Sequence, residues 1–312
     1  MYEGLAVGIT QAINEAGVDD ELPLTWMMVP RDGVNLALWT GGDGLTLVPD
    51  KKRLVKIYDT ADPKDRKVAE MRLGAVGFVA SPALRVVIVE ARKGAGAGET
   101  IISAQDARSK NRGQVLEVSV KSPRQVNVVI NFVRFRDASG NPVNHTSTDP
   151  SMAAPWVQGM NKIYTPQSNV VFKLQEARWV QYEKQFNRVI RPTDYEELFK
   201  KRIADEGVMN IFIVGEFEKD SNPRSRGDNY TGVTVNHQNI ICEEVGDKDK
   251  HDMVKLLAHE AMHYLLREGH HDYDKKKTHW VLEQLSFQTG TKIPKIHANK
   301  INPVVTPKRG KK

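Results

Sequence analysis

Short apolar runs separated by Gly, Pro and Asp clusters fill the first part of the chain, from Thr25 to Val120. Apolar and polar side chains alternate in several of these runs, as in strands with one buried face. The runs cover residues 34–39, 45–48, 84–89, 100–104 and 115–120. About seven short strands in one stretch predict an all-β sandwich, which we place at residues 1–122.

A different pattern begins after Pro123, where proline interrupts strand pairing. Residues 126–133 form a nearly continuous apolar run, typical of a strand covered on both faces. Asp149-Pro150 predicts a helix start, with aspartate as the cap and proline in the first turn. Further elements are predicted at residues 170–174, 194–206, 209–214, 232–235 and 239–242. This alternation of strands and helices predicts a second, α/β domain at 123–312, and so an α+β two-domain protein.

An amphipathic helix follows, with its apolar side formed by Met253, Leu257 and Met262. Asp247 or Asp249 is placed to cap its start. Gly269 stands where a helix ends in the left-handed conformation.

This helix carries the motif His259-Glu260-x-x-His263. Side chains four residues apart share one helix face, so both imidazoles can bind one metal ion. Glu260, which is not needed as a ligand, is placed to take a proton from water and pass it to a leaving amine. An i,i+4 His pair can also be a solvated helix face. The motif's position in an amphipathic helix, with more His residues after it, favours a Zn2+ site.

The composition changes this picture little. The chain has 312 residues, 40% hydrophobic and 27% charged, without an apolar run long enough to predict a membrane span. The N-terminus lacks the features of a secretory signal, which leaves localisation unknown. The single cysteine, Cys242, excludes an internal disulfide and a thiolate zinc cluster, and its apolar neighbours predict burial.

The formal charge of +6 indicates some affinity for polyanions. Much of it comes from the C-terminal tail, residues 308–312. No basic stripe is interleaved with aromatic residues, so we predict no nucleic-acid partner.

Residues 125–304 resemble metzincin-type zinc metallopeptidases of bacteria, on the strength of the stretch from His259 to His271. The resemblance implies a twisted sheet before the active helix, a glycine turn after it, a third His ligand and a methionine turn under the metal. Two features depart from the family. At the position of the family's glycine this chain has Leu266, and at the position of the third His it has Gly269. No methionine follows Met262. Residues 98–121 resemble the end of bacterial immunoglobulin-like (Ig-like) domains.

The resemblance leaves the third zinc ligand open. His270 and His271 are both candidates, because one or two extra residues in the turn can return either to the metal. Glu283, in an expected helix after His263, is the corresponding ligand if the protein is similar to thermolysin-like peptidases instead. His279 is a further candidate with an expected structural or hydrogen-bonding role.

The expected function is a zinc-dependent endopeptidase with Glu260 as general base, acting on a protein or peptide substrate. Val233–Val235 is the candidate edge strand for binding extended substrate by β-augmentation. The alternatives are a binding or adhesion protein that uses the β-sandwich, and an effector protease exported without a signal. The N-terminal domain is a candidate site for a protein partner in either case.

Overall fold

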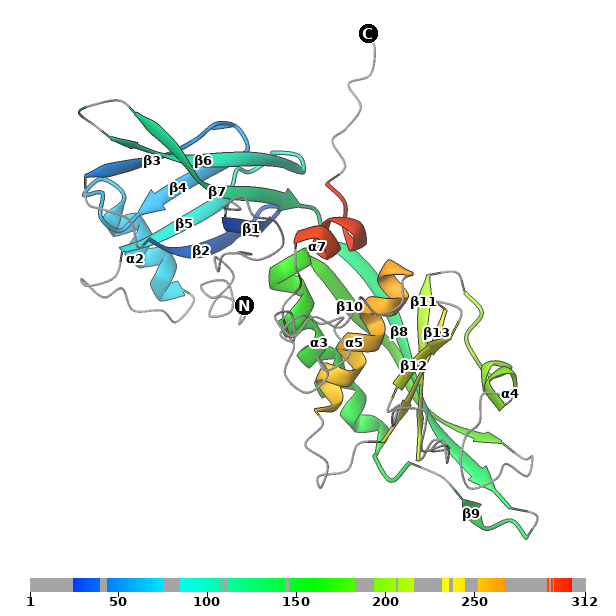
Figure 1. The fold of residues 1–312 in the computed structure, drawn as a ribbon. Helices are drawn as coiled ribbons and strands as arrows, with labels where there is room; N and C mark the ends of the chain where they lie inside the picture. The colour runs from blue at the N-terminus through cyan, green and yellow to red at the C-terminus, as the bar shows by residue number, and fades with distance from the viewer. Residues whose placement is uncertain are drawn as a thin grey trace, which may run out of the picture. The chain divides into compact units, whose positions relative to one another are not determined.

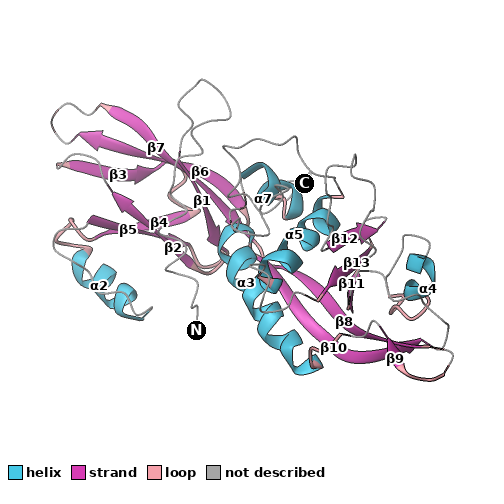
Figure 2. Cartoon of the chain, turned by 60° about the horizontal axis from the view of Figure 1, so that its bottom comes forward, coloured by secondary structure: helices cyan, strands magenta, loops and turns pink. Residues whose placement is uncertain are grey.

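The computed structural model shows an α+β protein with antiparallel and mixed sheets (Figures 1 and 2). It describes residues 25–39, 44–75, 85–106, 108, 111–137, 139–143, 146–182, 194–205, 207–215, 232–235, 238–244, 252–267, 291, 293 and 295–304. Residues cluster into two compact units. The first comprises Met1–Arg124, Tyr164–Val170 and Ile293–Lys312, and the second comprises Gln125–Ile163 and Val171–Lys292. Domains at 1–122 and 123–312 stay a prediction.

The first unit contains two sheets. One has the order β1 (Thr25–Pro30), β7 (Arg112–Lys121), β6 (Gly98–Asp106) and β3 (Leu45–Pro49), and the other β2 (Val34–Trp39), β5 (Arg85–Ala91) and β4 (Val55–Asp59). All the pairings are antiparallel except β1 with β7, which is parallel. Met27, Val118, Ala37 and Val89 contribute to one buried apolar cluster, so the two sheets share a core.

Helix α2 (Arg66–Ala75) corrects the all-β prediction for this unit. Ala69 and Leu73, four residues apart, are fully buried in a cluster with Leu36, Tyr58 and Ile88 of the three-stranded sheet. The helix therefore covers that sheet. Its narrow apolar stripe lies among charged residues, which is why the sequence pattern did not reveal it.

Helix α7 (Lys295–Ile301) also belongs to the first unit. The buried ammonium of Lys121 donates to Asn299 Oδ1 at 2.8 Å and to the Asn302 carbonyl at 2.5 Å. Burial is the main cause that lowers the pKa of Lys121 to about 8. The end of β7 is thus tied to the C-terminal helix by a buried polar contact.

The second unit contains a sheet with the order β10 (Val170–Tyr182), β8 (Arg124–Arg136), β11 (Val208–Val214), β13 (Asn239–Glu243) and β12 (Gly232–Val235), and β9 (Pro142–Val143) also pairs with β8. β8, β11 and β13 are parallel, whereas β12 is antiparallel to β13. Val128–Phe132 lie buried in β8, and every residue of β11 is buried. The prediction of a strand covered on both faces is confirmed.

Helices flank this sheet. The 3-10 turn Pro150–Met152 leads into α3 (Ala153–Ser168), and Asp149 caps the turn as predicted, because its side chain accepts from Ser151 N at 2.8 Å. The remaining helices are α4 (Tyr195–Phe199) and α5 (Met253–Leu266). Within the described residues, no helix has the length and apolar character to cross a membrane.

The helix predicted at 194–206 is wrong in its length, because α4 ends at Phe199. The buried side chain of Asn210 explains the early end. Its Oδ1 accepts from Ile203 N at 2.9 Å, and its Nδ2 donates to Ile203 O at 2.9 Å. These contacts replace the helical hydrogen bonds of Ile203.

Gly159 of α3 lies against Val254 at the start of α5. A Cβ built on Gly159 would stand 2.6 Å from Val254 Cγ1 and 2.7 Å from Cγ2. We therefore expect Gly159→Ala to lower the free energy of unfolding by about 1–3 kcal/mol, since overpacking outweighs alanine's helix propensity. Urea unfolding would measure it.

Gly113→Ala is the control, because a Cβ there has no neighbour within 4 Å. A Gly159→Ala protein as stable as the parent would contradict the close packing of α3 on α5.

Candidate metal centre

Helix α5 begins and ends at residues other than those predicted. Asp252, rather than Asp247 or Asp249, is the N-cap, and its side chain accepts from Val254 N at 2.9 Å. At the other end Arg267 takes the left-handed conformation, with φ 58°, and its N–H donates to the His263 carbonyl. The prediction that Gly269 makes the left-handed stop is therefore wrong. The helix is shorter at both ends than the pattern implied.

His259 and His263 meet on one face of this helix. Both are buried, with 3% and 7% of their surface exposed, and their Nε2 atoms lie 3.2 Å apart. Two nitrogens bound to one tetrahedral zinc ion at about 2.0–2.1 Å are separated by about 3.3 Å. The separation of the two Nε2 atoms matches that of two ligands to one metal ion, and it also matches a hydrogen bond between the two rings.

The remaining candidate ligands, His270, His271 and Glu283, lie outside the described residues, as does His279. Among residues the structure does describe, no group of three or more His, Cys, Asp or Glu side chains forms a metal-binding cluster. The third ligand stays a prediction.

Glu260 is buried between α5 and strand β12, with 4% of its surface exposed. The hydroxyl of Thr234 lies 2.7 Å from Glu260 Oε2 and 3.0 Å from the Glu260 carbonyl oxygen. Burial raises the pKa of Glu260 to about 7, and the hydrogen bond from Thr234 partly opposes this rise. A bound cation at the His pair would lower this pKa, because a nearby positive charge favours the carboxylate.

Gly232 makes this arrangement possible. A Cβ built there would lie 2.9 Å from Glu260 Oε1 and 3.0 Å from Leu256 Cδ1, so a side chain at this position would displace the Glu260 carboxylate and the Leu256 methyl group. Gly232 and Thr234, two residues apart, face α5. Val233 and Val235 pack instead against the apolar cluster on the opposite face of the sheet.

Sequence reasoning gave β12 the role of an edge strand but missed Thr234 and Gly232 as neighbours of Glu260. The alternation along β12 was the available signal, since it puts the small and the hydroxyl-bearing residue on one face. Nothing in the local sequence identified α5 as the element that this face contacts.

Cys242 of β13 is fully buried and unbonded to another cysteine, so the predicted burial is confirmed. Burial raises the pKa of the thiol well above its usual value, and the charge of Glu260 adds to the rise. The thiol therefore stays protonated near neutral pH and is unsuited to metal binding in this state.

Comparisons with known proteins give little further information. No protein-family profile matches the chain, and no curated protein matches it. A solved 2,6-sialyltransferase from Photobacterium sp., in complex with CMP and lactose, is similar at a TM-score of 0.18 and 6% identity. The similar region covers 62% of this chain and 36% of the sialyltransferase, and so weak a likeness carries no argument.

The hydrogen bond between Thr234 and Glu260 can be tested by measuring the free energy of unfolding. We expect Thr234→Val to lower the free energy of unfolding by about 1–3 kcal/mol, because a buried carboxyl loses its donor while the packing volume is kept. Thr234→Ser, which retains the hydroxyl, should recover most of this loss. Urea unfolding of both variants is the measurement, and equal losses in the two would contradict the hydrogen bond's role.

Proposed function

We propose that the protein is a zinc-dependent endopeptidase. The observation that carries the proposal is the 3.2 Å approach of the His259 and His263 Nε2 atoms, with Glu260 next to the first ligand in the same helix. A purely structural metal site has no need of a general base, so Glu260 favours a catalytic role. The layout of the second unit, in which a mixed sheet with parallel β8, β11 and β13 precedes the His helix, supports the resemblance to metzincin-type peptidases.

Zinc, held by His259, His263 and one further ligand, would polarise a scissile carbonyl and acidify a water molecule. The Glu260 carboxylate accepts the proton of the attacking water and passes it to the departing amine. The Thr234 hydroxyl holds one carboxylate oxygen, Oε2, and so fixes which oxygen faces the reacting atoms. Low solvent exposure strengthens the electrostatic interactions of this carboxylate.

Strand β12 supplies a binding edge for an extended peptide. Its residues pair with β13 alone among the described strands, from Gly232 opposite Cys242 to Val235 opposite Asn239. An extended substrate adds to such an edge through main-chain hydrogen bonds. Because Glu260 lies against the inner face of β12, a peptide on that edge runs beside the proposed base.

We further propose that the first unit is an Ig-like accessory domain. With β1 to β7 lettered A to G, strands B, E and D share one sheet and C, F and G the other, which is the partition of an immunoglobulin sandwich. Strand A differs, because it pairs with G in parallel. The shared core between the sheets supports the same assignment.

Glu260→Gln tests the general base. We expect zinc content to remain at the parental level, while hydrolysis of casein falls by about 10²–10⁴-fold, because the amide cannot accept the proton. Metal analysis by mass spectrometry and a casein assay give the two readouts. Glu176→Gln, which removes an exposed carboxylate from β10, is the matched control and should keep full activity. Full activity in Glu260→Gln would refute the proposed mechanism.

The third ligand can be identified from metal content alone. We expect His263→Ala to lose zinc, and one of His270→Ala and His271→Ala to lose it as well, because a tetrahedral site needs three protein ligands and water. Loss in Glu283→Ala instead would assign the protein to the thermolysin-like class. A parent protein without zinc after reconstitution would refute the metal centre.

A further inference from the structure

A basic recess lies in the first unit, between the turn after β3 and the loop after β5. It has a volume of about 760 Å³ and is lined by Lys51, Lys52, Arg53, Leu54, Arg92, Lys93 and residues 94–98, which alternate glycine and alanine. Five of these side chains are cationic and none is acidic. We propose that this basic recess binds a carboxylate-rich peptide segment of a partner protein.

Hydrogen bonds connect the two sides of the recess. Arg92 N donates to the Leu54 carbonyl at 2.9 Å, and Arg92 Nε donates to the Lys52 carbonyl at 2.6 Å. Lys51 N also donates to Thr100 Oγ1 of the adjacent strand β6 at 2.9 Å, which holds the first side in place. The two segments are distant in sequence, yet their positions are fixed before a ligand arrives, which lowers the entropy cost of binding.

The charges of the recess are not neutralised within the described part of the chain. None of its five cations forms an ion pair with a described residue. The nearby Glu90 is instead paired with Arg72 at 2.8 Å. Like charges gathered in a concave surface reinforce one another's potential, so the recess attracts an anionic ligand.

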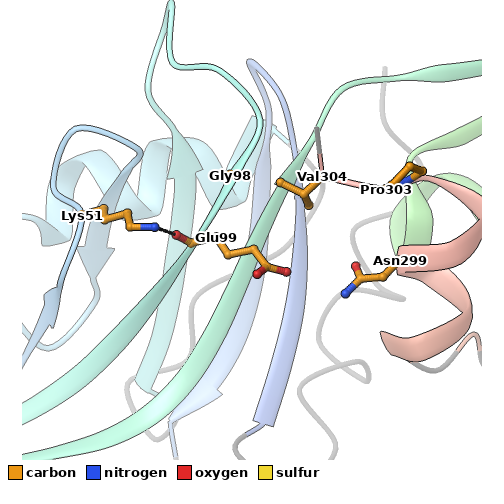
Figure 3. A pocket seen from close by; sticks show the side chains of 6 residues that line it. All are labelled: Lys51, Gly98, Glu99, Asn299, Pro303 and Val304. Carbon is orange, nitrogen blue, oxygen red and sulfur yellow. Dashed lines mark hydrogen bonds between the residues drawn. The ribbon is translucent and has the colours of Figure 1, made fainter. Parts of the chain in front are cut away.

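The nearest acidic residue to consider is Glu99, which lines an adjoining recess. A smaller recess of about 290 Å³ shares Lys51 and Gly98 with the basic recess and includes Glu99 (Figure 3). Lys51 Nζ donates to the Glu99 backbone carbonyl at 2.7 Å, while the Glu99 carboxylate points away from Lys51 (Figure 3). That carboxylate accepts from Ser119 Oγ at 3.1 Å, and its charge acts on the buried ammonium of Lys121, which lies outside the basic recess.

The residues of the recess favour an acidic peptide over nucleic acid or an anionic lipid surface. Among the described residues that line it, none has an aromatic side chain on which a nucleobase could stack. It also contains no large exposed hydrophobic residue for insertion into a lipid surface, since Leu54 is 7% exposed. A floor of glycine and alanine leaves room for an extended main chain, and the surrounding cations match acidic side chains along it. An acidic peptide satisfies all of these features.

The test is fluorescence anisotropy of a labelled oligoglutamate peptide with the full chain. The variant Lys52→Glu/Arg53→Glu/Lys93→Glu reverses three exposed charges whose side chains make no hydrogen bond to a described residue. Lys64→Glu/Lys67→Glu/Arg108→Glu is the control, since it makes the same change in net charge at exposed positions outside the recess. Circular dichroism checks that both fold.

We expect the parent and the control to bind the peptide and the recess variant to bind about tenfold more weakly or worse. Binding should weaken as salt is raised towards roughly 0.15 M, because the contacts are exposed. Equal losses in the two variants, or no binding by the parent at low salt, would overturn the proposal. So would tighter binding of duplex DNA or of phosphatidylserine vesicles that is lost in the recess variant. None of these outcomes involves the metal centre.

Discussion

The burial of the Glu260 carboxyl between helix α5 and strand β12 is the constraint on which the candidate centre depends. A buried carboxyl without a partner is costly, and Thr234 provides that partner at 2.7 Å. The helix can approach so closely because Gly232 presents no side chain. Since His259 and His263 belong to the same rigid helix, fixing Glu260 against the strand also fixes where the His pair lies relative to the sheet edge.

A second glycine allows close packing against α5 at a distance from the His pair. Gly159 lets α3 approach Val254 at the first turn of α5, as Gly232 lets β12 approach Glu260. Glycines therefore allow close packing against α5 at its first turn and near its middle. The proposed catalytic role would require groups held by packing on rigid elements, and α5 is packed in this way.

In the first unit the candidate binding residues lie in loops, whereas those of the second unit lie in a packed helix. Its two sheets share an apolar core, while the turn at 51–53 and the loop at 92–98 carry the charge. Loops on a rigid scaffold are common positions for binding residues. A peptidase unit with a charged accessory unit would separate the recruitment of a protein from its cleavage.

Local physics explains what the sequence by itself determined. Strand runs, the buried β8 and β11, the Asp149 cap and the i,i+4 His pair all depend on periodicity or on neighbours in the chain. Helix α2 was not predicted from the sequence, because its two buried residues, Ala69 and Leu73, form only a narrow apolar stripe among charged residues. The early end of α4 was not predicted, because the residue that causes it, Asn210, lies in strand β11.

Only the tertiary structure decided which distant residues meet. Thr234 reaches Glu260, Lys121 reaches Asn299, and Arg92 reaches Lys52 across separations that no periodic pattern encodes. These contacts depend on strand register and on which face of a sheet a helix covers. The physical reason is that burial and hydrogen bonding act between surfaces, which exist only once the chain has folded.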